Sequence, residues 1–317
     1  MNVLNEDRRA WPAGLEPAAI AMRDGWRLRA IDWLSAEAKP RGSILFQGGR
    51  GDILEKYLES FAFWRAQGWA VSGFDWRGQG GSGRFLEDRM IGHVPDFSIW
   101  VDDLAAYYEM WRATHPGPHI MIGHSMGGHL VTRALIEKRI APDAAVLVSP
   151  MFGFDTGPLP VSVSAWAVGM AARMGRAEKP AWKANERPAP PWTSRFKFLT
   201  HDDARYADEI WWKAQHPELA LGPPSINWLI QARESTLSTL APGAPEGVQT
   251  PMLIFGTDKD KLVSPKAIRE IAGRIPKARL TMFGAEAAHE LLREADPVRD
   301  VVLADIRAFL DEVAPAQ

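Results

Sequence analysis

One serine stands at the spacing that acyl-transfer enzymes use for a nucleophile. Residues 123–127 read Gly-His-Ser-Met-Gly and match the G-x-S-x-G pattern, with Ser125 at the centre. A short apolar run, residues 120–122, precedes the motif, and helical spacing continues from His129. This order of strand, tight turn and helix predicts that Ser125 sits on a strained turn, with its hydroxyl at the carboxyl edge of a sheet.

A serine hydroxyl is a weak nucleophile and needs a base, which an acid must orient. His289 follows the last predicted strand, residues 279–283, and two carboxylates, Asp258 and Asp260, follow the strand predicted at 252–255. Because parallel strands end at the same edge of a sheet, we expect the serine, one of the acids and the histidine to meet there. The spacing alone leaves the choice between the two acids open.

A glycine-rich turn, Gln47-Gly48-Gly49-Arg50, lies between the strand predicted at 43–46 and a helix. It lacks the Lys-Ser/Thr pair of a phosphate-binding loop. A backbone amide in such a turn can stabilise an oxyanion. We therefore predict that the amide of Gly49 or Arg50, together with that of Met126, forms an oxyanion hole.

Strands alternate with helices over most of the chain, which predicts an α/β fold with a mostly parallel sheet covered on both faces. A hairpin is predicted at Asp24-Gly25, followed by apolar strands at 43–46, 69–74, 120–122, 144–148, 252–255 and 279–283. The alternation stops between 151 and 225. We expect a core from 1–150 and 226–317, interrupted by a helical cap at 151–225.

Three further side chains are predicted to have structural roles. Asp75 and Arg77 lie in the glycine-rich loop 75–83, and we expect them to form an ion pair that ties this loop together. His124, inside the serine motif, is expected to point away from the partners of Ser125.

Composition excludes several classes of function. The 317 residues contain no cysteine, which rules out disulfides, thiol catalysis and thiolate metal sites. The 37 basic and 39 acidic residues leave a net charge of −2, so no nucleic-acid-binding surface is predicted. No metal and no cofactor are expected, because the histidines lack ligand spacing. The polar N-terminus predicts a cytoplasmic protein. The apolar run 161–172 is too short to span a bilayer, and two readings stay open for it: peripheral membrane contact through the cap, or a cap helix packed on the core.

Three motifs make the chain resemble the monoacylglycerol-lipase and lysophospholipase branch of the α/β-hydrolases over nearly its full length. They are G-H-S-M-G-G at 123–128, D-W-R-G-Q-G-G-S at 75–82 and Q-G-G-R-G-D-I-L-E-K-Y at 47–57. The resemblance implies Ser125 as nucleophile, His289 as base and Asp260, which precedes Lys-Leu-Val, as the acid. One departure is Gln47-Gly48-Gly49, where the lipases often carry His-Gly and bacterial lysophospholipase-like members carry Gln-Gly-Arg.

The predicted function is hydrolysis of carboxylic esters of lipid-like substrates, a lysophospholipid or a monoacylglycerol, through an acyl-enzyme. Four side chains of the insertion are predicted to line an acyl tunnel: Trp166, Met170, Phe196 and Trp211. A general carboxylesterase or another acyl or C–C bond hydrolase would keep the same triad and change this pocket. A ligand-binding protein on an inactive hydrolase scaffold is the alternative from another class.

Overall fold

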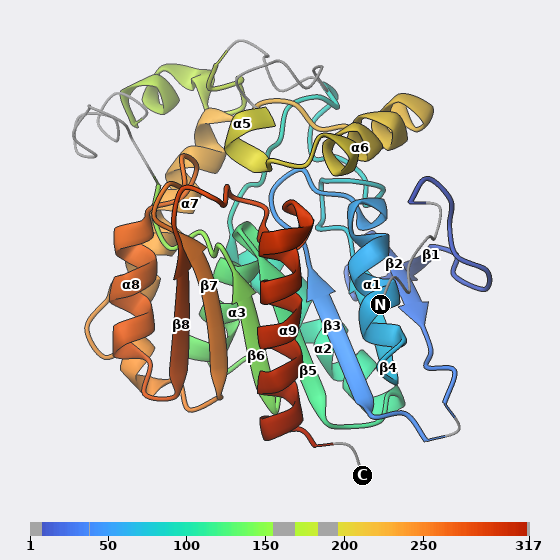
Figure 1. The fold of residues 1–317 in the computed structure, drawn as a ribbon. Coiled ribbons are helices and arrows are strands. Elements are labelled where there is room, and N and C mark those ends of the chain that lie inside the picture. The colour runs from blue at the N-terminus through green and yellow to red at the C-terminus, as the bar shows by residue number, and fades with distance from the viewer. Residues whose placement is uncertain (1–7, 38, 155–168, 183–195, 316–317) are drawn as a thin grey trace.

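The computed structural model describes residues 8–37, 39–154, 169–182 and 196–315. An eight-stranded sheet forms the centre, in the order β1-β2-β4-β3-β5-β6-β7-β8 (Figure 1). The pairs β1–β2 and β2–β4 are antiparallel, and all other neighbours are parallel. The strands are β1 (Ala18–Ala21), β2 (Arg27–Trp33), β3 (Gly42–Gln47), β4 (Trp69–Phe74), β5 (His119–His124), β6 (Ala144–Val148), β7 (Met252–Thr257) and β8 (Ala278–Phe283).

The burial of the strands explains their sequence patterns. Every residue of β3, β4, β6 and β7 is buried, so these strands are mainly apolar rather than alternating, and the few polar residues in them are buried too. In contrast, β2 alternates between exposed and buried positions, because it lies near the antiparallel edge of the sheet. The predicted hairpin is formed by β1 and β2, and the predicted parallel sheet is confirmed.

Helices cover both faces of the sheet (Figure 1). Apolar side chains of α2 (Ser98–Thr114), α3 (Met126–Ile136) and α8 (Pro265–Arg274) belong to one core cluster. On the opposite face, α1 (Leu58–Arg65) and α9 (Asp296–Val313) contribute to a second cluster. The two layers hold the sheet rigidly, and so they fix the positions at which its strands end.

The carboxyl ends of the central strands lie under a group of helices (Figure 1). Between β6 and β7 the described segments form η2, a π-helical stretch (Ala172–Arg176), α5 (Phe196–Leu199), α6 (Asp203–Gln215), η3 (Pro217–Leu219), α7 (Ile226–Leu240) and η4 (Pro245–Gly247). Short 3₁₀ turns η1 (Leu54–Tyr57) and η5 (Leu291–Arg293) flank α1 and α9. Within the described ranges, no helix has the length and apolar character required to cross a bilayer.

The expected ion pair between Asp75 and Arg77 does not form. Asp75 contacts Arg29 at 2.8 Å and accepts hydrogen bonds from the amides of Gly81 and Leu54. Arg77 instead extends toward α2, where its Nη2 lies 2.6 Å from Asp103. The prediction was wrong because each side chain finds a partner on a different element, although both partnerships stabilise the loop as expected.

Candidate active site

Ser125 occupies the turn between β5 and α3 in a strained conformation. Its φ of 52° and ψ of −118° are unusual for a residue with a Cβ. The turn is held because the Ser125 amide donates to the Val148 carbonyl of the neighbouring strand, at 2.9 Å. A Cβ at Gly123 would lie 2.7 Å from the Cα of Gly128, so this close approach of strand and helix requires glycine.

His289 and Asp260 lie beside this serine, although they come from distant parts of the chain. The Nε2 of His289 is 2.9 Å from the Oγ of Ser125, and its Nδ1 is 2.7 Å from Oδ2 of Asp260. Both His289 and Asp260 are buried, each with 3% of its surface exposed. The structure therefore brings together the three side chains that the sequence selected, with hydrogen-bond distances throughout.

The other carboxylate considered, Asp258, has a different environment. Its side chain is 48% exposed and forms an ion pair with Arg269 at 2.6 Å. Asp260, by contrast, accepts hydrogen bonds from the amides of Leu262 and Val263 through its Oδ1, which leaves Oδ2 directed at His289. The loop after β7 thus presents only the second of its two aspartates to the site.

Burial and charge act in opposite directions on this pair. Burial would raise the pKa of Asp260, but the charge of His289 and the hydrogen bond from it lower that pKa below the ordinary value. Burial would likewise lower the pKa of His289, yet the Asp260 carboxylate outweighs this effect and raises it. The arrangement therefore stabilises a protonated imidazole next to an ionised acid, as transfer of a proton from Ser125 requires.

His124 lies closer to the site than expected. Its ring centroid is 4.9 Å from that of His289, and both histidines line the cavity described below. Burial, followed by the charge of His289, lowers the pKa of His124 to about 4, so it is neutral at pH 7. Its Nδ1 lies 3.2 Å from the Val148 carbonyl, which anchors the ring to β6. The expectation that it points away was wrong, because the turn directs residues 124 and 125 toward the same rim.

The glycine-rich turn after β3 lies against Ser125. A Cβ at Gly49 would be 3.0 Å from the Cβ of Ser125, which shows how closely the turn approaches. The Gly49 amide donates its hydrogen bond to the carboxylate of Asp52, at 2.6 Å, and so cannot also bind an oxyanion. Of the two amides considered from the sequence, that of Arg50 is therefore the one we retain as an oxyanion donor beside Met126, the first residue of α3.

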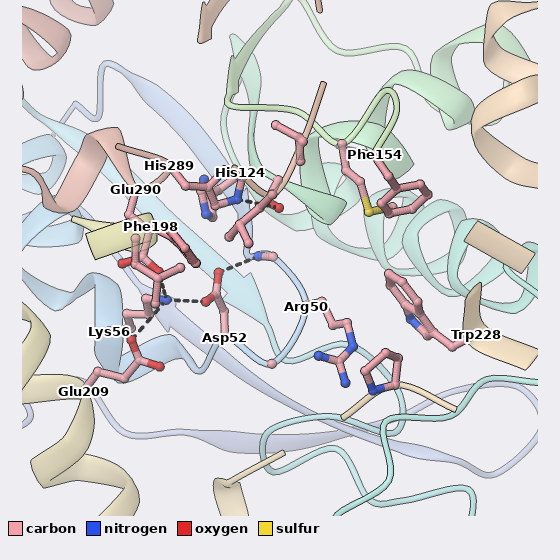
Figure 2. A pocket seen from close by; sticks show the side chains of 18 of the residues that line it. Arg50, Asp52, Lys56, His124, Phe154, Phe198, Glu209, Trp228, His289 and Glu290 are labelled. Atoms are coloured by element: carbon pink, nitrogen blue, oxygen red, sulfur yellow. Dashed lines mark hydrogen bonds and ion pairs between the residues drawn. The ribbon is translucent and has the colours of Figure 1, made fainter. Parts of the chain in front are cut away.

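A cavity of about 370 Å³ opens over these residues. Figure 2 shows that its two ends differ: Phe154 and Trp228 lie on one side, and the charged side chains Lys56, Glu209 and Glu290 lie on the other. Four further apolar residues line the cavity, namely Met151, Leu229, Leu262 and Val263. We call the side with Phe154 and Trp228 the apolar wall and the side with Lys56, Glu209 and Glu290 the charged wall. The guanidinium of Arg50 also lies at the apolar wall, 5.4 Å from the centroid of the Trp228 ring.

The four residues predicted to line a tunnel are placed as follows. Trp166 lies outside the described residues, and Phe196 begins α5, with its side chain not described. Met170 is 39% exposed, and Trp211 packs edge-on against Trp212, with ring centroids 5.0 Å apart. Neither Met170 nor Trp211 is among the described residues that line the cavity. The aromatic residues that do line it are Phe154, Trp182, Phe198 and Trp228.

The charged wall was missed in the sequence. Asp52 and Lys56 form an i,i+4 pair, which is a recognisable signal, but such spacing is also common on solvated helix surfaces. Glu209 and Glu290 come from distant segments with no motif of their own. In the part of the chain that is described, no group of three His, Asp or Glu side chains is arranged to hold a metal ion.

One protein family and several known proteins are similar to most of the chain. The family described as serine aminopeptidase, S33 (Hydrolase_4), matches residues 38–296. Lysophospholipase L2 of Escherichia coli is 31% identical over 284 residues, covering 83% of this chain and 78% of that protein. Phospholipase YtpA of Bacillus subtilis is 24% identical, covering 88% of this chain and 99% of the relative. A monoglyceride lipase structure from Saccharomyces cerevisiae shares the fold, with a TM-score of 0.73 at 17% identity over 98% of this chain and 99% of that one.

Proposed function

Because the chain belongs to the serine aminopeptidase, S33 (Hydrolase_4), family of α/β-hydrolases, we propose that it is a serine hydrolase that cleaves carboxylic esters of lipids. The single observation that carries this proposal is the hydrogen-bonded series Ser125–His289–Asp260 at the rim of a partly apolar cavity. The names of the relatives, a lysophospholipase, a phospholipase and a monoglyceride lipase, support a lipid ester as substrate.

Each side chain of the series has a defined task in ester cleavage. Ser125 Oγ attacks the ester carbonyl carbon as its proton passes to Nε2 of His289. The protonated His289 then donates that proton to the departing alcohol, which leaves an acyl-enzyme on Ser125. Water, deprotonated by His289, attacks the acyl carbon and releases the carboxylic acid, and Ser125 regains its proton. Asp260 holds the imidazole tautomer and its charge throughout.

The oxyanion formed in each step needs donors that are already in place. We assign the backbone amides of Met126 and Arg50 to this role, because Met126 begins α3 and Arg50 follows the Gly49 peptide that abuts Ser125. One such donor is typically worth about 3 kcal/mol of transition-state stabilisation. The N-terminus of α3 adds a favourable potential for negative charge.

The two walls of the cavity suggest how a lipid ester is oriented. An acyl chain would contact the apolar wall near Phe154 and Trp228, where its transfer from water is favourable. The head group, a glycerol or a glycerophosphate ester, would then face the polar wall near Lys56 and Glu209. Described residues of the segment 151–225 line both walls, Phe154 the apolar one and Glu209 the charged one, and we assign this segment as a cap over the site.

Contact with a lipid surface is part of this proposal. Three residues that line the cavity are also exposed apolar side chains at its mouth, Trp182, Phe198 and Leu262. Met174, which is 71% exposed, stands between the exposed cations Arg173 and Arg176. Apolar and cationic side chains together favour binding to an anionic bilayer surface. Cosedimentation with vesicles containing phosphatidylglycerol should fall for Met174→Asp, and equal binding of both proteins would contradict this contact.

The test of the proposed function is a panel of esters that vary in acyl length and head group, with Ser125→Ala as the control. The wild-type protein should hydrolyse lysophospholipid or monoacylglycerol and should be labelled by a fluorophosphonate at Ser125. Ser125→Ala should lose both properties while keeping its folded structure. Parent-rate hydrolysis by Ser125→Ala would refute the assignment, whereas labelling without hydrolysis of any lipid ester would favour another acyl or C–C substrate. A protein that is neither labelled nor active would be a ligand-binding scaffold.

A further inference from the structure

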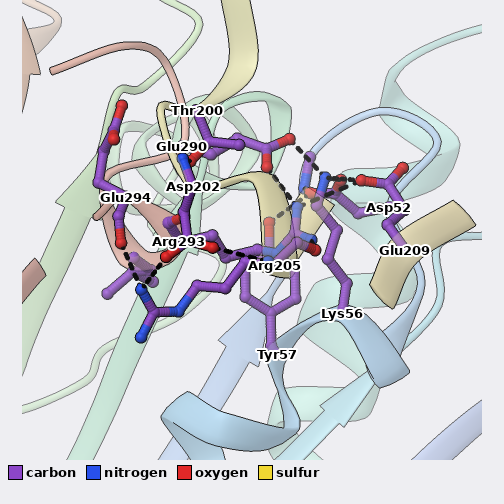
Figure 3. Close-up of polar contacts among 12 residues, drawn as sticks. Asp52, Lys56, Tyr57, Thr200, Asp202, Arg205, Glu209, Glu290, Arg293 and Glu294 are labelled. Carbon is purple, nitrogen blue, oxygen red and sulfur yellow. Dashed lines mark hydrogen bonds and ion pairs between the residues drawn. The ribbon is translucent and has the colours of Figure 1, made fainter. Parts of the chain in front are cut away.

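A buried cluster of charges lies directly behind the glycine-rich turn (Figure 3). Asp52 is its first member, and its Oδ2 accepts hydrogen bonds from the Gly49 amide and the Tyr57 hydroxyl, each at 2.6 Å. Its Oδ1 lies 2.5 Å from Nζ of Lys56. Because Asp52 holds the Gly49 peptide, its position fixes the turn that carries the Arg50 amide.

Lys56 extends the cluster to two other parts of the site. Its Nζ lies 2.6 Å from Glu290, the residue that directly follows His289, and 3.2 Å from Glu209 on the cap helix α6. Only 3% of the Lys56 side chain is exposed, so these interactions are screened little by water. One ammonium thus joins the glycine-rich turn, the histidine loop and the cap (Figure 2).

Two further cations, Arg293 and Lys213, belong to the cluster. Arg293 contacts Glu290 and lies 3.2 Å from Glu209. Lys213 lies 2.6 Å from Glu209 and also donates to the Gly51 carbonyl, at 3.0 Å. The three carboxylates Asp52, Glu209 and Glu290 are therefore matched by Lys56, Lys213 and Arg293.

Lys56 is the one cation that contacts both Asp52 and Glu290 among the ion pairs of the described residues. Without it, two buried carboxylates that come from different loops of the site would face one another with one positive charge fewer. Breaking a buried pair on one side leaves an uncompensated charge, which favours separation or protonation of the groups that remain. Separation of the two carboxylates would move the turn away from the loop that carries His289.

We propose that Lys56 is a positioning residue for hydrolysis: its ammonium holds Asp52 and Glu290 together and thereby sets the oxyanion-binding turn at its working distance from His289. This role rests on the proposed function, since it concerns the same serine chemistry. Lys56 acts through Asp52 and Glu290, and touches neither Ser125 nor the ester carbonyl in this scheme.

The experiment compares Lys56→Met, Lys56→Arg and Arg299→Met on p-nitrophenyl butyrate. Arg299 is the matched control, because it is a buried cation whose guanidinium pairs with Glu59 and whose contacts lie away from the cavity. Active sites are counted by fluorophosphonate titration, so that kcat refers to folded, reactive protein. Lys56→Met should lose about 10-fold to 100-fold in kcat, less than deletion of an oxyanion donor, with KM little changed. Lys56→Arg should recover most of the activity.

The pH profile separates this role from a purely structural one. His289 faces the carboxylates of Asp260, Glu290 and Asp52 and the neutral ring of His124. Removing the Lys56 charge leaves two of these carboxylates less compensated, so the acid limb of kcat should move to higher pH in Lys56→Met. The limb should stay in place in Arg299→Met, even if that variant melts at a lower temperature.

Three results would overturn the proposal. They are an unchanged kcat per titrated site in Lys56→Met, an equal loss in Arg299→Met, and no recovery in Lys56→Arg. If Lys56→Met fails to fold, Glu290→Gln replaces it, since this near-isosteric change removes the same ion pair and should also lower kcat. Ser125→Ala is measured alongside, because retained activity in that variant refutes the proposed function itself, whereas the results above bear only on Lys56.

Discussion

Asp258 and Asp260 stand two positions apart on one loop, yet Asp258 pairs with Arg269 at the surface and Asp260 is buried against Nδ1 of His289. The difference follows from the turn after β7, where the amides of Leu262 and Val263 bind Oδ1 of Asp260 and orient the carboxylate inward. The two aspartates therefore form a natural pair of test and control substitutions.

Asp260→Asn should lower kcat by about 10,000-fold, because the amide no longer stabilises the imidazolium and favours the wrong tautomer. Asp258→Asn removes a carboxylate from the same loop and should change kcat less than about 2-fold, since exposed ion pairs contribute little. Steady-state kinetics on p-nitrophenyl butyrate would distinguish them. A larger loss in Asp258→Asn would mean that the two aspartates have exchanged roles in solution.

The pH dependence of kcat/KM should report the titration of His289. Burial lowers the pKa of this imidazole, but the Asp260 carboxylate raises it by more, so the net value lies above the ordinary 6.5. Only neutral His289 can accept the proton of Ser125, and activity should therefore disappear as the pH falls through that raised value. The rate of fluorophosphonate labelling should follow the same limb. An acid limb below pH 6.5 in both assays would contradict the electrostatic account.

Gly127→Ala should destroy the site, whereas Gly273→Ala should leave it intact. A Cβ at Gly127 would lie 2.5 Å from the Gly48 carbonyl oxygen and even closer to that of Gln47, so the glycine-rich turn would have to move. A Cβ at Gly273, in α8, meets no described atom within 4 Å, and Ala in a helix is favoured over Gly by about 1 kcal/mol. Thermal melting and labelling of Ser125 would check both. Normal labelling of Gly127→Ala would show that the turn is more adaptable than its contacts indicate.

Leu229→Trp should shorten the preferred acyl chain. Leu229 is one of the apolar residues that line the cavity, and a larger side chain there would occupy space that a long chain needs. Hydrolysis of dodecanoyl esters should fall at least about 10-fold relative to butyryl esters, a loss of the size that one or two excluded methylenes produce. Trp211→Ala serves as the control, because that ring packs on Trp212 and should not affect chain-length preference. If Trp211→Ala changes the preference instead, the acyl chain follows the path first expected from the sequence.

Arg205→Met should release the cap helix α6 from the core. The Arg205 guanidinium binds Glu59 through two contacts of 2.8 Å, reaches Asp296 at 2.7 Å and is 5% exposed. Breaking such a buried pair costs about 3–5 kcal/mol in the free energy of unfolding, measurable by urea denaturation. Arg279→Met removes an exposed pair with Glu312 and should leave the free energy of unfolding almost unchanged, because solvent screens exposed ion pairs. Equal effects of the two substitutions would show that α6 is held by other contacts.

Much of the fold was predictable because the buried strands consist mainly of apolar residues. The predicted strands 69–74 and 144–148 coincide with β4 and β6. Both strands are buried on each face, and both begin and end with an apolar residue, which marks their bounds in the sequence. The α/β-hydrolase fold and the lipid-esterase class are confirmed by the family match and the relatives. The boundaries of the cap remain a prediction.

The site was only partly predictable. Ser125 and His289 could be selected because each follows a predicted strand, and parallel strands end at the same edge of the sheet. The choice of Asp260 over Asp258 needed the family motif. No local pattern could have assembled Lys56, Glu209 and Glu290, because they come from η1, α6 and the loop after β8. The aromatic side chains of the insertion could be expected to pack, but the sequence does not show against which part of the protein. Trp211, for example, packs against Trp212 and the neighbouring core cluster rather than over Ser125.

The neighbouring positions of β6 and β7 have a consequence for how such proteins diversify. The two strands pair directly, with Val148 beside Phe255, although the segment 151–225 separates them in the sequence. Replacing that segment would leave every strand partnership in the sheet unchanged. Chimaeras that graft a foreign segment here, while retaining partners for Glu59 and Lys56, offer a direct route to new substrate preferences on an unaltered nucleophile.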